Sequence, residues 1–253
     1  MIFAAMDESY QGGRIAAVGG YVGTKKKWSK LIDEWMKVVL PTKIRSFHMA
    51  DCEARKEDFE FYWTPDYLLE IKKRLFQIIL NRAKFGVVVA VNLRDYKDLT
   101  RGMSKDRAHP YIQDPYYFCL FAAVQAVLRI VPIAIPQFPL DEKVPFIFDE
   151  NDQFRGRALR YWPYFRYAFR SHSIYKRLGN LVFAEDAFFP PVQAADILVY
   201  EGAKRMLHQL TEPDRKWRES LLMLCSKKNL YYTLYERDEL AKHIDGMKKD
   251  GVF

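Results

Sequence analysis

Acidic residues follow three separate apolar runs of this chain, and together they could bind a divalent cation. The three pairs are Asp7–Glu8, Asp149–Glu150 and Glu185–Asp186. Clustered carboxylates repel one another, and this repulsion raises the pKa of each. A hard divalent cation such as Mg²⁺ removes that penalty because it prefers oxygen ligands. Two such ions, about 3.5–4 Å apart, would activate a water and stabilise the leaving oxygen of a phosphodiester.

A further acid, Asp196, lies in the apolar segment VQAADILVYEGA. Helical spacing places Gln193, Asp196 and Tyr200 on one face. An unpaired Asp among Ala and Ile would be costly to bury, so Asp196 needs a partner, which a metal shared with the strand-end acids would supply. The alternative is a first-turn acid stabilised by the helix dipole, because a proline pair just before it marks a helix start.

The two acids of each pair cannot all bind a metal directly. Side chains alternate along a strand, so Asp7 and Glu8 face opposite ways, as do Asp149 and Glu150. We select Asp7 and Asp149 as the direct ligands. Each also has a simpler explanation as the first polar residue of a turn, which the sequence DEND at 149–152 favours.

The scaffold that positions these acids is predicted to be mixed α/β. Gly12 and Gly13 would join the first two strands in a hairpin, and later strands alternate with helices as βαβ units. Pro163 is expected to interrupt one helix, and Pro132 to end another. Apolar runs predict strands at 2–6, 14–23, 85–93, 143–152 and 180–186. Helical spacing predicts helices at 25–40, 64–83, 116–131, 154–170, 190–210, 212–226 and 236–249.

The length and charge of the chain favour one domain with a polyanionic partner. The 253 residues fit a single domain, with a helical insertion at about 25–83 and a C-terminal helical extension at about 212–253. A net charge of +8 suggests nucleic acid as a partner, although the Lys and Arg residues could simply aid solubility. The segment 157–170 interleaves Arg with aromatic residues, which suits nucleic-acid contact or an amphipathic core helix.

The three cysteines, Cys52, Cys119 and Cys225, are far apart and odd in number, which excludes a disulfide framework and a CxxC metal site. The N-terminal segment lacks a signal-peptide pattern. We read no apolar run of the roughly 18 residues that a membrane span needs. The sequence therefore predicts a cytoplasmic protein without membrane contact.

At MDESY, FIFDEND and FFPPVQAADILVYEGAKR the chain resembles the family called the domain of unknown function numbered thirty-eight hundred, of the ribonuclease H-like superfamily. That family opens with a strand ending in Asp-Glu-Ser, carries an Asp at the end of a middle strand and closes with a Gln-x-Ala-Asp helix. The resemblance implies a mixed five-stranded sheet flanked by helices, a divalent-metal site and nuclease-like chemistry. The segment 25–83 would be an insertion between the second and third strands.

The resemblance also implies roles for particular residues. His48, in FHMAD, resembles a histidine often found after the first helix of the family, and it can equally be a structural loop residue. Tyr10 stands where the family usually has Gly, so the segment after Asp-Glu-Ser is expected to differ in shape. The catalytic and metal-binding positions are matched by Asp7, Asp149 and Asp196. The flanking, second-tier positions are matched by Glu8, Ser9, His48, Asp186 and Gln193.

These observations lead to one principal hypothesis and two alternatives. The principal hypothesis is a nuclease that uses Mg²⁺ or Mn²⁺ bound by the three aspartates to cleave phosphodiester bonds. The first alternative is a non-catalytic module on the same fold that binds nucleic acid or protein. The second is an aspartyl-phosphate phosphatase, which Ser9 disfavours because such enzymes usually carry Asp-x-Asp after the first strand.

Overall fold

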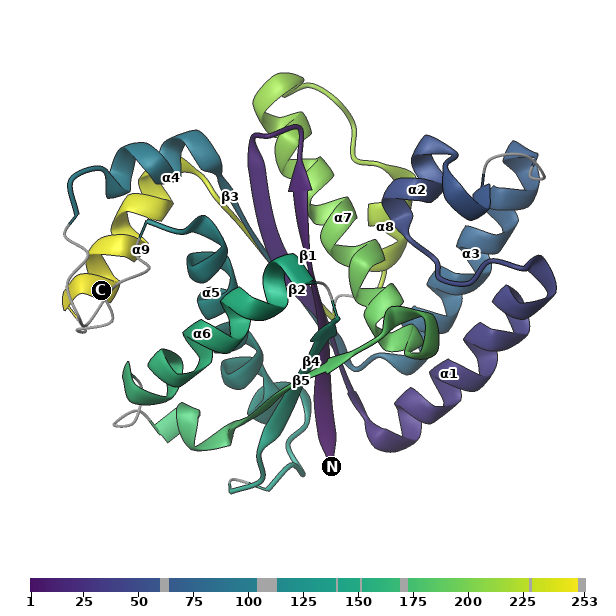
Figure 1. Cartoon of the computed structure of the whole chain (residues 1–253), viewed down its shortest axis with the longest axis horizontal. Coiled ribbons are helices and arrows are strands. Elements are labelled where there is room, and N and C mark those ends of the chain that lie inside the picture. Colours follow the sequence, from purple (N-terminus) through teal and green to yellow (C-terminus); the bar gives the residue numbers. More distant parts are fainter. Residues whose placement is uncertain are drawn as a thin grey trace.

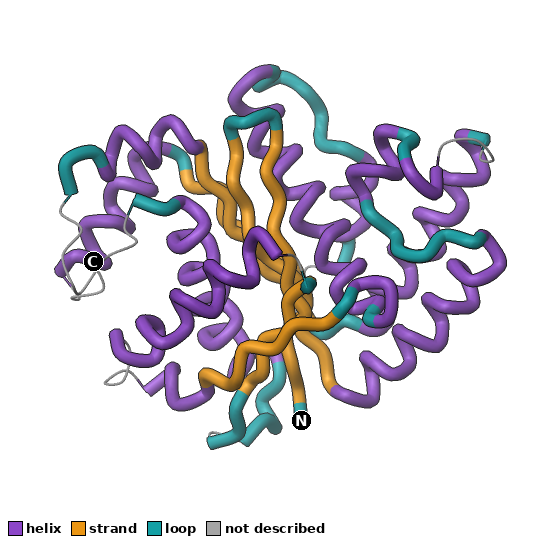
Figure 2. Tube along the Cα trace, in the orientation of Figure 1, coloured by secondary structure: helices purple, strands orange, loops and turns teal. Residues whose placement is uncertain are grey.

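The computed structural model describes residues 1–59, 64–103, 113–139, 141–150, 152–168, 173–227 and 229–249. Over these residues six strands form one mixed sheet in the order β5-β4-β1-β2-β3-β6 (Figure 2). β1, β2 and β3 are antiparallel neighbours, whereas β4, β5 and β6 each run parallel to the strand beside them. The strands are β1 (Ile2–Gln11), β2 (Ile15–Thr24), β3 (Phe85–Asn92), β4 (Val144–Asp149), β5 (Leu178–Ala184) and β6 (Leu230–Tyr235).

Helices cover both faces of this sheet (Figure 1). One face carries α4, α5, α6 and α9, and the other carries α1, α2, α3, α7 and α8. The α/β class predicted from the sequence is therefore confirmed. The helices are α1 (Lys25–Val39), α2 (Met49–Ala54), α3 (Pro65–Arg82), α4 (Leu93–Thr100), α5 (Pro115–Ala134), α6 (Asp152–Ala168), α7 (Pro190–Thr211), α8 (Glu219–Cys225) and α9 (Arg237–Lys249).

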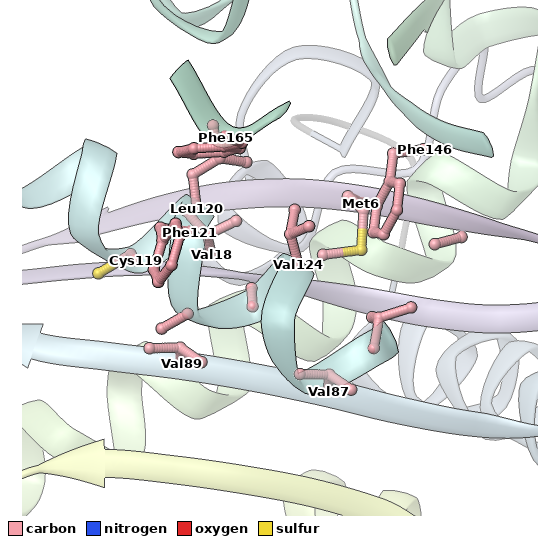
Figure 3. Close-up of a cluster of buried hydrophobic side chains, with 14 of the residues drawn as sticks. Met6, Val18, Val87, Val89, Cys119, Leu120, Phe121, Val124, Phe146 and Phe165 are labelled. Atoms are coloured by element: carbon pink, nitrogen blue, oxygen red, sulfur yellow. The ribbon is translucent and has the colours of Figure 1, made fainter. Parts of the chain in front are cut away.

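α5 is the central helix of one face and is apolar almost all round. Figure 3 shows Leu120, Phe121 and Val124 of this helix among side chains of the sheet and of α6. The helix is long and apolar enough to span a membrane by length and composition, so the expectation that no segment reaches this length was too strict. In the folded chain 67% of its most apolar window is buried, which is typical of a core helix.

α7 covers the opposite face and crosses β1, β2 and β3. Small residues let it approach closely, since Ala194, Ala195 and Ala203 are fully buried against the sheet. At Gly202 a Cβ atom would lie 2.7 Å from Cγ1 of Val88, so only glycine fits without a shift of β3 or of the helix. This close approach determines where Asp196, on the same helix, lies above β1.

The prediction of five strands was wrong in number, because β6 extends the sheet beyond β3. The sequence predicts only helices in the C-terminal segment, at about 212–253. β6 has the sequence LYYTLY, and its side chains are half-buried or exposed, as expected for a short edge strand. The Tyr and Thr residues of LYYTLY are typical of strands, so this segment carries a local strand signal that the helical interpretation of the C-terminal segment missed.

Four predicted features also differ in the structure. β1 continues beyond residue 6 to Gln11, because it stays paired with β2 up to the glycine turn.

Two prolines lie inside helices instead of ending or interrupting them. Pro132 lies within α5, two residues before its end, and Pro163 lies within a continuous α6. Around Pro163, the rings of Trp162 and Phe165 pack into the core and offset the lost backbone hydrogen bond. The segment 46–55, which lies outside every helix predicted above, contains the short helix α2. Residues 104–112 lie outside the described residues.

Substituting two helical glycines tests the close contact between α7 and the sheet. Both Gly202→Ala and Gly246→Ala gain the same helix propensity, about 1 kcal/mol. Only at Gly202 does the new methyl group collide with Val88, whereas nothing lies within 4 Å at Gly246 in α9. We expect Gly202→Ala to be about 1–3 kcal/mol less stable than Gly246→Ala in urea unfolding. Equal stability of the two variants would contradict the packing described here.

Candidate functional site

The structure brings Asp7 and Asp149 together on one face of the sheet. β1 and β4 are parallel neighbours in which Met6 pairs with Phe148, so the next residues, Asp7 and Asp149, lie side by side. Neighbouring strands are about 4.8 Å apart. Ala5 and Ile147, two residues earlier in each strand, pack in the core under α7, and alternation therefore directs both carboxylates toward this helix.

The position of Asp7 within its strand differs from the prediction. The sequence suggested that Asp7 and Glu8 follow the end of the first strand, yet β1 continues through Gln11. Asp7 pairs with Gly19 of β2 on the side opposite β4. Its backbone is therefore held on both sides, while Asp149 is the last residue of β4. Asp7 is placed by the interior of the sheet rather than by a loop.

Asp196 of α7 completes the group of three aspartates. Burial is the largest cause that raises the pKa of Asp7, and the charges of Glu8, Asp196 and Asp149 raise it further. The pKa of Asp196 is raised to about 6, mainly by burial, although a hydrogen bond from the Met49 backbone N–H to its Oδ2 (2.6 Å) opposes the change. Burial, followed by the charge of Asp186, also raises the pKa of Asp149. The three aspartates therefore share one electrostatic environment.

Glu8 faces the other side of the sheet, as the alternation argument predicted. It follows Met6 on the face covered by α5, and Tyr10 on the same face stacks on Phe154 of α6. Burial is the main cause that raises the pKa of Glu8 to about 8, and Asp149 and Asp196 contribute. Glu8 therefore adds negative charge to the site without sharing its face.

Ser9 accepts a hydrogen bond from the side chain of Gln11, at 3.0 Å. The strand pleat places Ser9 on the same face as Asp7, two residues further along β1. The Ser9 hydroxyl is therefore hydrogen-bonded to a neighbour within the strand.

Asp186 connects the carboxylates to the segment before α2. His48 Nε2 lies 2.8 Å from Asp186 Oδ2, and the Ser46 hydroxyl donates to the same oxygen. Burial favours the neutral form of Asp186, but these hydrogen bonds outweigh it and lower its pKa. The same contact raises the pKa of His48 to about 9, with burial opposing it. The backbone N–H of Asp186 also hydrogen-bonds the Asp149 carboxylate.

The side chain of Gln193 holds the segment before α2 and the turn at Asp186 together through hydrogen bonds. Its Oε1 accepts hydrogen bonds from the Trp35 indole (2.8 Å) and from the Phe47 backbone N–H (3.0 Å). Its Nε2 donates to the Asp186 carbonyl at 2.7 Å. The side chain is 2% exposed, so it is a buried link between α1, the segment 46–48 and the turn at Asp186 rather than a surface group.

The donor chemistry of the site suits a hard cation, but no coordination shell is already formed. Across the described part of the chain, no three His, Cys, Asp or Glu side chains are grouped so that they could hold a metal ion as they stand. The aspartates lie on rigid strands and a packed helix, so only rotation of their side chains could bring the oxygens closer. A cavity of about 240 Å³ lies elsewhere, between α3 and α8, and none of these aspartates lines it.

Sequence reasoning missed the polar groups that hold the site together. Ser46, Trp35 and the backbone N–H of Met49 all bind site residues from the segment between β2 and α2. The types and spacing of these residues are ordinary for a helix and a loop. Their sequence separation from their partners exceeds one hundred residues, so only the folded chain reveals the contacts.

Comparisons of this chain with protein-family models, with curated proteins and with solved structures give no match. The family resemblance therefore rests on the three motifs quoted above and stays a prediction.

The Gln193 link can be tested by truncation. Gln193→Ala leaves the Trp35 N–H and the Phe47 N–H without their acceptor, and each buried unpaired group costs about 1–3 kcal/mol. The Asp186 carbonyl loses one of its two donors but keeps the Phe189 N–H. We expect a loss of about 2–4 kcal/mol in the free energy of unfolding, measured in urea. The matched control is Gln77→Ala on the exposed face of α3, which should change stability by less than about 0.5 kcal/mol. Similar losses in both variants would contradict the linking role.

Proposed function

We propose that this protein is a metal-dependent, nuclease-like hydrolase that cleaves phosphodiester bonds at a site formed by Asp7, Asp149 and Asp196. The observation that carries the proposal is the convergence of three aspartates from β1, β4 and α7 on one face of the sheet. Proteins rarely gather acids whose pKa values are raised by burial and by one another unless the site has a function. The net charge of +8 favours a polyanionic substrate.

The topology supports a ribonuclease H-like interpretation of the fold. Five contiguous strands, β5-β4-β1-β2-β3, form a mixed sheet whose antiparallel start is followed by parallel strands. The acids lie on the first strand, on the next parallel strand and on the helix after β5, in the chain order that the motif resemblance implies. β6 adds to the far edge beside β3 and leaves this arrangement uninterrupted.

Mg²⁺ or Mn²⁺ fits the donor set of this site, because all three side chains offer carboxylate oxygens and their mutual repulsion favours a bound cation. Such an ion, when bound, supplies Lewis-acid polarisation of a phosphoryl oxygen and acidification of a water. Asp7 and Asp149 would hold it from neighbouring strands, and Asp196 from the helix above them. The Met49 N–H fixes the carboxylate of Asp196 in orientation.

His48 places positive charge at the edge of the carboxylate group. With a pKa raised to about 9 by Asp186, its imidazole is protonated at neutral pH. Its side chain is 43% exposed, so it remains accessible to an incoming anion. We infer that His48 attracts and orients a phosphate group, while Asp186 holds the imidazole in place.

The second candidate function is a non-catalytic module that binds nucleic acid or protein on the same fold. One observation favours it: no ready-made metal group exists among the described residues. A module of this kind would bind its partner equally well with and without a chelator, and it would show no turnover.

Cleavage of labelled DNA and RNA with Mg²⁺ or Mn²⁺ tests the proposed reaction. We expect the wild-type chain to cleave at least one of them, and chelator to stop cleavage. Asp7→Asn removes an oxygen ligand and should reduce the rate by about 100-fold or more. The exposed Asp33→Asn on α1 is the matched control and should keep full activity. A wild-type chain that cleaves neither substrate with either metal, or an active Asp7→Asn variant, would refute the assignment.

Metal-dependent stability gives an independent test with a defined pH dependence. The pKa values of Glu8 and Asp196 are higher than normal, about 8 and about 6, so the folded state binds their protons more tightly than the unfolded state does. Without metal, the contribution of these groups to stability therefore decreases as the pH rises from about 4 to about 8. Mn²⁺ at about 100 times its dissociation constant should add about 2.7 kcal/mol. That corresponds to a Tm increase of about 5–10 °C near pH 8, and a smaller increase near pH 5, where protons compete.

Asp7→Asn separates the metal effect from general stabilisation. The variant removes a buried carboxylate whose pKa is raised, so its metal-free Tm at alkaline pH should equal or exceed that of the wild type. Its response to Mn²⁺ should be largely lost, whereas Asp33→Asn should respond like the wild type. Identical Mn²⁺ responses in all three chains would show that the aspartates do not bind the ion.

A further inference from the structure

Phe188 has the most exposed large apolar side chain among the described residues, at 77%. It lies in the short 3-10 turn Asp186–Phe188 that joins β5 to α7. An exposed ring loses the free energy that burial would provide, of the order of 1.5–3 kcal/mol. Phe188 stands two residues after Asp186, whose backbone N–H hydrogen-bonds the Asp149 carboxylate.

The backbone that carries Phe188 is firmly held. Its N–H donates to the Glu185 carbonyl at 3.1 Å, and the N–H of Phe189 donates to the Asp186 carbonyl at 3.0 Å. The Asp186 carbonyl also accepts the buried Gln193 side chain. The ring of Phe189 lies 6.0 Å from the ring of Phe3, so the following residue is anchored in the core. The turn therefore presents the Phe188 ring outward from a fixed position.

A cationic side chain contacts the same turn, because His48 Nε2 lies 2.8 Å from Asp186 Oδ2. The segment before α2 is attached to Asp186 through Ser46 and His48, and Lys43 and Arg45 of this segment are exposed. The Arg45 backbone is fixed by a hydrogen bond of its N–H to Asp58, at 2.8 Å. A rigid exposed aromatic ring with nearby cations is the combination that proteins use to bind unpaired bases and their phosphates.

We propose that Phe188 is a stacking platform for an unpaired base, and that the substrate class of the site is single-stranded nucleic acid. This inference rests on the proposed function and specifies its substrate. In a duplex the faces of the bases are covered by their neighbours, so a ring can stack only on a base that is unpaired or splayed out. Base–aromatic stacking tolerates any sequence, because every base has a π-face.

Binding of labelled single-stranded and duplex oligonucleotides of equal length tests the proposal by fluorescence anisotropy. The full chain carries Asp7→Asn to prevent cleavage, and the buffer contains millimolar Mg²⁺. Phe188→Ala should weaken single-strand binding by about 5- to 150-fold, and should change duplex binding by less than about 2-fold. Phe188→Trp should retain single-strand affinity, and its indole fluorescence should be quenched when the strand binds.

The matched control is Ile133→Ala, which truncates a 73% exposed side chain on α5 and should leave binding unchanged. The inference would be overturned if Phe188→Ala kept its single-strand affinity, or if it lost equal affinity for single strand and duplex. It would also be overturned if the parent chain bound no nucleic acid. Because the assay measures binding, absence of cleavage by the wild type would defeat the nuclease proposal alone. Cleavage that does not depend on Phe188, with unchanged affinity, would defeat the stacking proposal alone.

Discussion

Crowding of half-buried carboxylates is the constraint on which the rest of this structure depends. Asp7, Asp149 and Asp196 come from two strands and a helix, and burial is the main cause that raises the pKa of each. Neighbouring acids raise these pKa values further: Glu8, Asp196 and Asp149 act on Asp7, Asp186 acts on Asp149, and Asp51 and Asp186 act on Asp196. Such a group opposes folding at neutral and alkaline pH unless a cation or bound protons neutralise it. The scaffold must therefore supply enough apolar burial to hold the acids in place.

That burial comes from the two helical layers on the sheet. α5 fills one face with side chains that are buried nearly all round, and α7 lies close to the other because of its small residues. Close packing leaves little room for the backbones under the aspartates to shift. The rigidity that makes their repulsion costly also fixes the backbones of the three aspartates, so only side-chain rotation could bring their oxygen atoms together.

Polar contacts around the group extend this organisation to the surface. Gln193 joins α1, the segment 46–48 and the turn at Asp186, and Asp186 in turn holds His48 in its cationic form. One side of the site is therefore strongly negative while its edge carries a positive charge. Under the proposed function, the phosphate of a phosphodiester would meet this cation first, and its reacting oxygens would approach a metal held by the acids.

The sequence by itself determined the α/β class and most of the elements, because apolar periodicity is a local signal. It also suggested Asp7, Asp149 and Asp196 as one site, because acids in apolar surroundings stand out locally, and their shared role stays a prediction. The alternation of strand side chains also separated Asp7 from Glu8 correctly. Only the tertiary structure decided the strand order, the sixth strand, the full length of β1 and the contacts of Trp35, Ser46 and Met49 with site residues. These features depend on partners that are distant in the sequence, and the local pattern of an edge strand or a loop contains no information about which distant group it meets.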